Sequence, residues 1–358
     1  MSSTMGKNII LSLFGESHGP CVGATVHGLP AGIKLDLKYI DEFMDRRKAR
    51  LDDFSTHRLE EDEYKIISGV TNGYTNGAPL TVIIENKKAN KGDYDKIVDL
   101  ARPSHADFTA NVKFNGYNDA YGGGHFSGRL MAPVCFVGAV CKKFLEDKNI
   151  KIYSHLFSVG DIMDTPFDMT NIFTHDVENI YKKKLPVISE VATDKMLKLV
   201  KEVRNENDSI GGIIECACVG VPAGVGSPHF EGVENKISSA VFGIPAVKGI
   251  EFGSGFAGSI LKGSENNDEF YINDGAVKTK TNNCGGILGG ISNGMPIVFR
   301  VAVKPTASIG IEQNTINLKN KENTKIKISG RHDSCIALRA APCVEAMTAI
   351  VICDMLMG

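Results

Sequence analysis

The sequence predicts an α+β protein, a β-α-β layered sandwich with an internal pseudo-two-fold repeat. Strand-like runs alternate with a few long apolar or amphipathic helices along the chain. Two turns also recur, Gly-x-Pro-Ala-Gly at 28–32 and 220–224, and Asn-Gly-x-Pro at 76–79 and 293–296. Because each half then orders its elements alike, we expect the helices of both halves to lie between two sheets. A doubly wound sheet is the alternative.

Alternation and turn signals define the first half. They predict strands at 8–13, 21–27, 65–70 and 80–85. Asp36 is the predicted N-cap of a helix on which Leu37, Ile40 and Phe43 fall at helical spacing. A long loop with the polar segments 102–107 and 122–129 follows, and an apolar helix ending near Glu146 closes this half.

The second half repeats this order. It has predicted strands at 210–219, 247–252 and 296–303, and predicted helices at 231–242 and 344–357, the latter with Pro342 near its start. No Pro/Gly/Ser-rich linker divides the chain, so residues 1–358 form one predicted domain. Its halves are about 1–150 and 205–358. We expect residues 151–204 to be an insertion on the outside, with a helix at 194–204.

Composition excludes several classes of protein. The chain has 358 residues, 42% of them hydrophobic and 23% charged, with a formal net charge of -2. This charge gives no overall attraction to nucleic acid or to anionic membranes. Nine cysteines without a C-x-x-C pair predict reduced thiols and a cytoplasmic protein. The first eight residues do not resemble a signal peptide. The C-terminal apolar run includes Glu345 and Asp354 and is shorter than the ~20 residues of a membrane span.

A glycine-rich block at 281–309 is the most distinctive stretch of the chain. Five glycines precede a strand that ends in Lys304, followed by Pro-Thr-Ala-Ser. Glycine lets backbone N–H groups approach an anion or a flat ring, so the block could bind a ligand. The usual nucleotide fingerprints G-x-G-x-x-G and G-x-x-x-x-G-K-[ST] do not occur in it. The alternative is a hairpin with glycine-rich turns.

Histidines and arginines in the loops suggest chemistry on an anion. His18, His105 and His332 each lie beside glycine, arginine or an acid, and imidazole suits proton transfer near neutral pH. No pair has metal-binding H-x-x-x-H spacing, so we predict no metal. Arginine forks suit phosphate and carboxylate oxygens. Solvated surface charge is the alternative for each arginine.

Six motifs resemble those of the chorismate synthase family, and together they cover nearly the whole chain outside 151–204. They are G-E-S-H-G at 15–19, R-P-x-H-A-D at 102–107, G-G-G-x-x-S-x-R at 122–129, N-x-x-G-G-I-L-G-G-I-S-x-G at 282–294, K-P-T-x-S-I at 304–309 and G-R-H-D-x-C at 330–335.

The resemblance implies a lyase that converts 5-enolpyruvylshikimate 3-phosphate to chorismate and phosphate by anti-1,4-elimination. This is the last step of the shikimate pathway toward the aromatic amino acids. The family needs reduced FMN (FMNH2) without net redox change, some members use NADPH to supply it, and a homotetramer is expected. A flavin-dependent oxidoreductase acting on an anionic substrate is the alternative enzyme. An RNA-binding module would need aromatic side chains among the basic residues at 46–58, where only Phe54 occurs.

The resemblance also implies roles for individual residues. His18 would protonate the departing phosphate, His105 the reduced flavin near N1, and Asp333 would help flavin N5 accept the substrate proton. The implied substrate-binding residues are Ser17, Arg47, Arg102, Arg129 and Arg339. The implied flavin contacts are His125, Phe126, Ser127, Ala246, Gly289, Lys304, Pro305, Thr306, Ala307, Ser308 and Arg331.

Five positions depart from the family pattern. His125-Phe126 stands where Arg-Ser is usual, Tyr121 replaces a frequent arginine, and Pro245 replaces an asparagine beside Ala246. Asp53 occupies a position that often holds arginine and is associated with NADPH. Because Asp53 would repel a 2′-phosphate, we expect the chain to lack useful flavin reductase activity.

Overall fold

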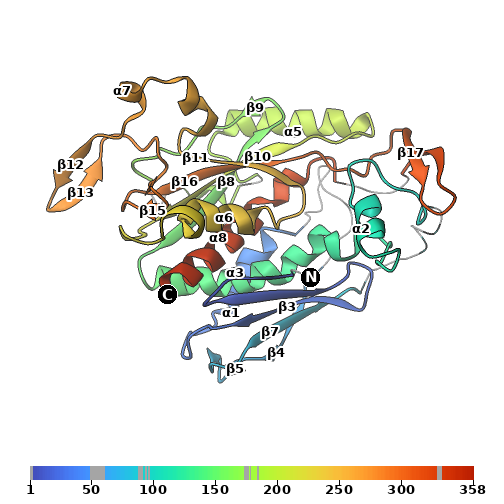
Figure 1. Ribbon diagram of the computed structural model, residues 1–358, viewed down its shortest axis with the longest axis horizontal. Helices are drawn as coiled ribbons and strands as arrows, with labels where there is room; N and C mark the ends of the chain where they lie inside the picture. Colours follow the sequence, from blue (N-terminus) through green and yellow to red (C-terminus); the bar gives the residue numbers. More distant parts are fainter. Residues whose placement is uncertain are drawn as a thin grey trace.

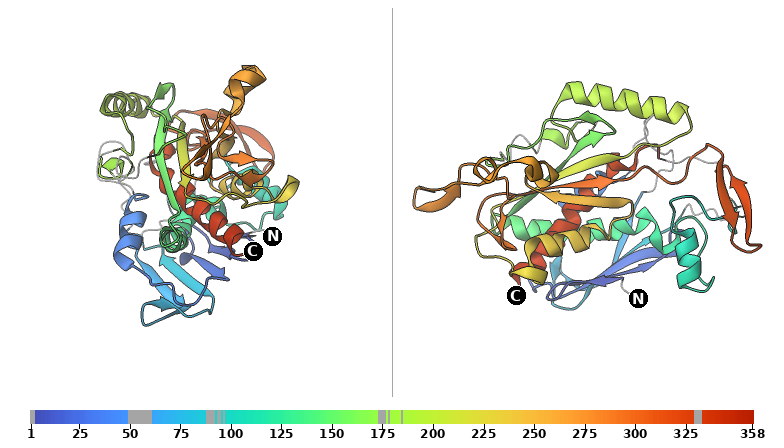
Figure 2. Two further views of the ribbon diagram at one scale, coloured as in Figure 1. Left: turned by 90° about the vertical axis from the view of Figure 1, so that its left-hand side faces the viewer. Right: turned by 45° about the horizontal axis from the view of Figure 1, so that its top comes forward.

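Two five-stranded antiparallel sheets enclose a pair of long helices in the computed structural model (Figures 1 and 2). It describes residues 3–48, 61–87, 92, 95, 97–172, 177, 179–183, 185–328 and 333–358. The first sheet has the order β1 (Thr4–Met5), β2 (Ile10–Gly15), β3 (Cys21–His27), β7 (Leu80–Glu85), β4 (Tyr64–Ser68). The second has the order β11 (Val247–Phe252), β16 (Ile297–Val303), β10 (Gly212–Val219), β8 (Lys151–Val159), β9 (Ile162–Met163).

Helices α3 and α8 form the middle layer, α3 at Met131–Glu146 and α8 at Ala341–Leu356. Helix α1 (Leu37–Asp45) packs on α3, and α6 (Val233–Val241) packs on α8. The predicted cap is confirmed, since the Asp36 carboxylate accepts a hydrogen bond from Tyr39 N at 3.1 Å. Because α3 and α8 lie between the two sheets, the predicted α+β sandwich is also confirmed.

The two halves share one topology. Strands β2-β3-β7-β4 and β8-β10-β16-β11 lie in the same order in their sheets, and the short helices α1 and α6 pack on the long helices α3 and α8 in the same way. The recurring turns make the same bonds. The Thr75 hydroxyl donates to Pro30 O at 2.6 Å, and the Ser292 hydroxyl donates to Pro222 O at the same distance. This equivalence confirms the predicted internal repeat.

The predicted insertion at 151–204 begins too early. Its first nine residues form β8, which is almost wholly buried and pairs with β10. A Cβ on Gly28 would lie 1.9 Å from Asn8 O, and one on Gly220 would lie 2.2 Å from Asn149 O, so the strands after Asn8 and Asn149 are equivalent. We infer that the second repeat begins near residue 149. Helix α5 (Glu190–Asn205) does lie on the outside, against β8 and β9 (Figure 1).

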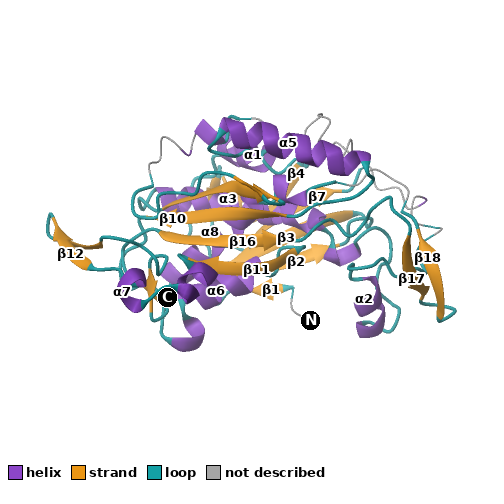
Figure 3. Cartoon of the chain, turned by 90° about the horizontal axis from the view of Figure 1, so that it is seen from above, coloured by secondary structure: helices purple, strands orange, loops and turns teal. Residues whose placement is uncertain are grey.

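Smaller elements project from this core (Figure 3). The hairpin β12–β13 (Phe270–Asn273, Ala276–Thr279) and the hairpin β17–β18 (Gln313–Asn317, Glu322–Ile326) lie at opposite ends of the molecule. The other short elements are β5 (Val70–Thr71), β6 (Tyr74–Thr75), α2 (Asp107–Lys113), α7 (Gly263–Asn266), β14 (Ile287–Leu288), β15 (Ile291–Ser292), and 3-10 turns at Gly124–Phe126, Gly128–Leu130, His229–Glu231, Gly255–Ile260 and Ile336–Arg339. Among the described residues, no helix has the length and apolar character needed to cross a membrane.

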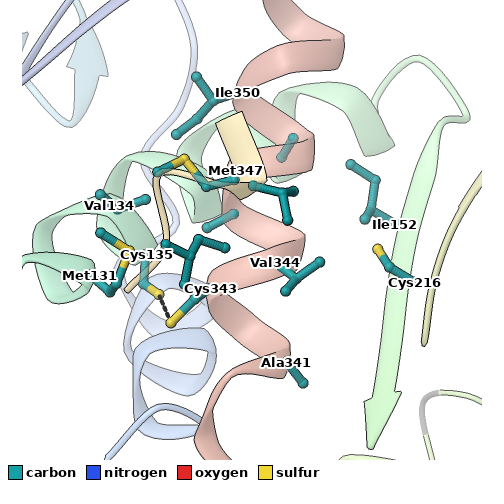
Figure 4. Packing of buried hydrophobic residues seen from close by; sticks show 14 of the residues in the cluster. Met131, Val134, Cys135, Ile152, Cys216, Ala341, Cys343, Val344, Met347 and Ile350 are labelled. Atoms are coloured by element: carbon teal, nitrogen blue, oxygen red, sulfur yellow. Dashed lines mark hydrogen bonds between the residues drawn. The ribbon is translucent and has the colours of Figure 1, made fainter. Parts of the chain in front are cut away.

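Helices α3 and α8 cross at close range (Figure 4). Cys135 Sγ lies 3.9 Å from Cys343 Sγ, and Cys141 O accepts from Cys353 Sγ at 3.6 Å, so the contacts follow the same direction along both helices. Between them, a Cβ on Gly138 would lie 2.3 Å from Ala346 Cβ. The N-termini of both helices therefore lie at the same end of the sandwich.

Gly138→Ala is expected to destabilise the protein by on the order of 1–3 kcal/mol, because the added methyl group must push α3 and α8 apart. Denaturant unfolding measures this loss. Gly263→Ala is the control, since a Cβ at that helical position meets no atom within 4 Å. Equal free energies of unfolding for the two variants would contradict the close contact.

Candidate active site

Three loops meet near the start of α3, at the end of the sandwich where α8 also begins. The turn at Gly128–Leu130 leads into α3 and the turn at Ile336–Arg339 leads into α8. Ser17 N donates to Gly124 O at 3.1 Å, and the Arg102 guanidinium donates to Gly122 O, so the loops at 15–19, 102–107 and 122–126 contact one another. Helix N-termini carry partial positive charge and favour anions. The geometry thus favours an anionic ligand here.

His18 is buried at the centre of this group of loops. Its Nδ1 lies 3.0 Å from the Ser17 hydroxyl. Gly122 has a φ of +62°, and a Cβ there would lie 2.3 Å from the His18 ring. Glycine is therefore required at 122, both for its backbone conformation and for the close approach of the imidazole. The predicted catalytic His18 and the glycine-rich motif at 122–129 do lie together.

His105 is held by a hydrogen bond to a carboxylate within its own loop. Its Nδ1 lies 2.6 Å from Asp107 Oδ1, and Arg102 donates to both carboxylate oxygens, each at 2.7 Å. Burial would raise the pKa of Asp107, but the hydrogen bonds from Arg102 and His105 outweigh burial and hold the pKa well below its usual range. Asp107 is therefore an anion at neutral pH.

The second half of the chain reaches this loop through Lys304. Its ammonium group donates to Ser104 O, and its backbone N–H donates to Ala246 O at 2.9 Å. Burial, together with the charge of Lys248, lowers the pKa of Lys304. The predicted flavin contacts at the end of β16 are thus joined to the loop that carries His105.

Arg47 and Arg129 share one buried carboxylate. Both guanidinium groups donate to Asp62, whose side chain is 0% exposed, and Arg129 Nε also donates to Asn86 Oδ1 at 3.1 Å. Burial would raise the pKa of Asp62, but the two arginines outweigh it and lower the pKa. Sequence reasoning missed Asp62, because nothing in its local sequence identifies two partners 15 and 67 residues away.

Asp333 and Arg339 form an ion pair in the segment that leads into α8. The hydrogen bond from Cys135 and the charges of Arg47 and Arg339 lower the pKa of Cys343 against the effect of burial. Arg339 ends the turn that leads into α8, and Arg47 shares Asp62 with Arg129, which lies in the turn that leads into α3. The structure thus gathers the predicted substrate-binding arginines near the two helix N-termini.

The predicted flavin contacts fall into separate groups. The His125 ring makes two hydrogen bonds, with Gly15 O at 2.8 Å and with the Ser3 hydroxyl at 2.7 Å, which tie it to β2 and the N-terminal segment. Ser127 Oγ accepts from Arg129 N at 3.2 Å, and Phe126 is half-exposed. Arg331 and Asp53 lie outside the described residues.

Gly289 does not lie with the other predicted contacts. It occupies the turn between β14 and β15, before β16 begins, whereas Lys304, Pro305, Thr306, Ala307 and Ser308 follow the end of β16. Seven residues of β16 separate these positions, a distance of roughly 20 Å along a strand. Within one chain, Gly289 therefore lies at the other end of the second sheet. Among the described residues, no group of three or more His, Cys, Asp or Glu could hold a metal ion.

Comparison with known proteins identifies the family. The profile described as "Chorismate synthase" matches residues 9–357. The chain belongs to the chorismate synthase family. Chorismate synthase of Dehalococcoides mccartyi is 43% identical over 355 residues, which cover 99% of this chain and 96% of that protein. Chorismate synthase of Thermococcus gammatolerans is 44% identical over 353 residues, covering 98% and 97%.

A crystal structure of a chorismate synthase has the same fold. It matches with a TM-score of 0.77 and 28% identity, covering 98% of this chain and 92% of that one. The resemblance inferred from the motifs is therefore confirmed. The chain is an enzyme with chorismate synthase activity, a lyase of the shikimate pathway that acts on a small molecule, and its family uses a flavin. This assignment decides against the oxidoreductase and RNA-binding alternatives.

Proposed function

We propose that the enzyme eliminates phosphate from 5-enolpyruvylshikimate 3-phosphate in an anti-1,4 sense, with reduced FMN as its cofactor. The observation that carries the proposal is that buried His18, packed on Gly122, lies in the loops beside the N-terminus of α3, where Arg47 and Arg129 share Asp62, while Arg339 precedes α8. The substrate bears a phosphate and two carboxylates, and reduced flavin is itself anionic. Guanidinium groups and helix N-termini favour such charges.

The segment after β16 fits a polar cofactor. The Thr306 hydroxyl oxygen is buried and has no hydrogen-bond partner among the described residues. A buried polar atom normally has a partner, so a ligand that hydrogen-bonds Thr306 would complete it. Lys304 next to it supplies a cation. Lys304, Thr306 and Ser308, with Ala246 and Ser127, would hold the flavin, which when bound supplies electron density to the breaking bonds.

Three side chains of this chain would handle protons. His18, beside Ser17, would donate a proton to the phosphate oxygen as the carbon–oxygen bond breaks. His105 would hold a proton at Nε2 near the N1 side of the flavin. Asp333 would help to take up the proton that the substrate loses. Arg47, Arg129 and Arg339 would orient the phosphate and carboxylates. The elimination removes phosphate and one proton, forms one double bond and consumes no reductant.

The test is an anaerobic mixture of enzyme, photoreduced FMN and 5-enolpyruvylshikimate 3-phosphate. We expect phosphate and chorismate to form in equal amounts over many turnovers while the FMN stays reduced. Consumption of one equivalent of reduced flavin per phosphate, or no phosphate release, would contradict the proposal.

The reductant is proposed to come from outside this chain. Asp53 stands at a position associated with NADPH, and its negative charge would repel the 2′-phosphate. NADPH is thus not expected to be oxidised by the enzyme in air with FMN. Oxidation well above a control without enzyme would show that the chain has flavin reductase activity.

A homotetramer in the cytoplasm is the proposed state of the enzyme. The hairpin β12–β13 exposes Phe270, Ile272 and Val277, and Phe256 and Ile260 nearby are more than four-fifths exposed. Exposed apolar side chains in such numbers favour an interface between copies. All nine cysteines are unpaired thiols, as in reducing compartments. Light scattering coupled to gel filtration is expected to give the mass of four chains, and a monomer would exclude this assembly.

A further inference from the structure

Asp107, the last residue of the R-P-x-H-A-D motif, is hydrogen-bonded to both Arg102 and His105 of the same motif. Its Oδ1 lies 2.6 Å from His105 Nδ1 and 2.7 Å from Arg102 Nη2. Its Oδ2 accepts from Arg102 Nε at 2.7 Å and from Arg102 N at 2.9 Å. One carboxylate therefore fixes both the imidazole and the guanidinium.

The protonation of this group follows from its hydrogen bonds. An ionised carboxylate only accepts hydrogen bonds, so the nitrogen of His105 that faces Asp107 must carry a hydrogen. Nδ1 is then the N–H donor, and exchange of a proton with a ligand is left to Nε2. A carboxylate that selects the tautomer and orientation of an imidazole in this way acts as a positioning group.

The Arg102 guanidinium is directed into the protein. Its Nε and Nη2 donate to Asp107, and Nη2 also donates to Gly122 O, next to His18. The Arg102 side chain is only 6% exposed. These bonds link the loop of His105 to the loop that packs on His18, which is a structural use for Arg102.

The other side of the loop is fixed from the second repeat. Ser104 has a φ of +59°, and its carbonyl oxygen accepts from Lys304. Left-handed backbone at a residue other than glycine is uncommon and needs support from its surroundings. His105 is thus held between Asp107 on its own loop and Lys304 at the end of β16.

We propose that Asp107, backed by Arg102, is the positioning residue that sets the tautomer and orientation of His105. The inference rests on the proposed function, in which His105 exchanges a proton at Nε2. Arg102 then acts through Asp107 and Gly122, not as a ligand of the substrate's anionic groups.

The test is a double-mutant cycle between Asp107→Ala and His105→Ala. Asp107→Ala is expected to lower kcat roughly tenfold or more, with the dissociation constants of FMN and substrate unchanged. In the His105→Ala background, the same substitution is expected to lower kcat no further, because groups that act as a unit are non-additive. Arg102→Lys is expected to lower kcat with KM unchanged.

Additional loss in the double variant that equals the loss in Asp107→Ala alone would overturn the inference. A higher KM with normal kcat for Arg102→Lys would return Arg102 to substrate binding. Normal turnover of His105→Ala would instead remove the role of His105 in the proposed function, and this inference with it. The two failures are thus distinguishable, because only the second appears in the single His105 variant.

The Asp107→Ala variant is expected to fold. Asp107 and Arg102 line a cavity together with Asn111 and Asn118, so Asp107→Ala removes atoms beside open space, not from a packed core. Should that variant fail to bind FMN, Asp107→Asn keeps the shape and enters the same cycle. Asp36→Ala is the matched control, because it removes a carboxylate that caps α1 and is expected to cost about 1 kcal/mol of stability with kcat unchanged.

Discussion

Replacing His105 by alanine is expected to lower turnover on the order of 10²–10⁴-fold, the range typical of a lost general acid or base. FMN and substrate should still bind, because the Arg102–Asp107 pair and the Lys304–Ser104 contact do not need the imidazole. Anaerobic stopped-flow measurement of phosphate release, together with titration of FMN and substrate, separates turnover from binding. A variant with a rate close to that of the wild type would exclude His105 from proton transfer.

The matched control is His27→Ala. His27 is exposed at the end of β3, whereas the loop of His18 precedes the start of this strand. Removing this imidazole should leave both turnover and binding unchanged. If both histidine variants lost activity equally, the loss would be a general consequence of substitution, not of the chemistry at His105.

The repeat could be predicted because its turns depend on local chemistry. Gly28 and Gly220 have positive φ and meet a backbone oxygen so closely that only glycine fits. Each half therefore has a glycine at the same point of the turn, and this glycine can be recognised in the sequence. The equivalence of β2 and β8 could not be predicted in this way, because β8 contains buried polar residues that are hydrogen-bonded to residues outside the strand. His155, for example, is hydrogen-bonded to Asp164 and Glu215.

The site could be predicted to the same extent. His18 could be predicted as a functional residue because it lies beside glycine in the segment 15–19. His105 could be predicted because it lies between an arginine and an acid in the segment 102–107. The contacts that fix these groups come from distant residues. Arg46 and Arg47 are neighbours in the sequence, yet Arg47 pairs with Asp62 while Arg46 pairs with Glu345, 299 residues further on. No local pattern separates the two roles.

Glu345 is the centre of a buried network that fixes Arg46 away from the site. The side chain is 0% exposed, and Lys142 Nζ donates to it at 2.7 Å, Ser154 Oγ at 2.7 Å and Tyr181 Oη at 2.9 Å. Arg46 also lies over the Tyr181 ring, 3.6 Å from its centroid. Burial would raise the pKa of Glu345, but Arg46 and Lys142 outweigh burial and lower the pKa from 4.5 to about 2.

Glu345→Gln is expected to destabilise the protein by about 3–5 kcal/mol, because two buried cations lose their shared anion. The control is Glu312→Gln, which breaks the exposed pair with Lys325 and should cost less than about 1 kcal/mol. Denaturant unfolding at pH 7 measures both. A difference of under about 1 kcal/mol between the two variants would show that Glu345 does not hold the cations in place.

The pH dependence of stability is a second test of the role of Glu345. The pKa of Glu345 is lower in the folded chain, about 2, than its ordinary value of 4.5, so the folded state binds this proton less readily. The stabilisation by Glu345 is therefore complete above about pH 4.5 and is lost as the pH falls toward about 2. Glutamine cannot titrate, so the stability difference between wild type and Glu345→Gln should shrink across this window, by on the order of 3 kcal/mol. A difference that stays constant down to pH 2 would mean that folding does not lower the pKa of Glu345.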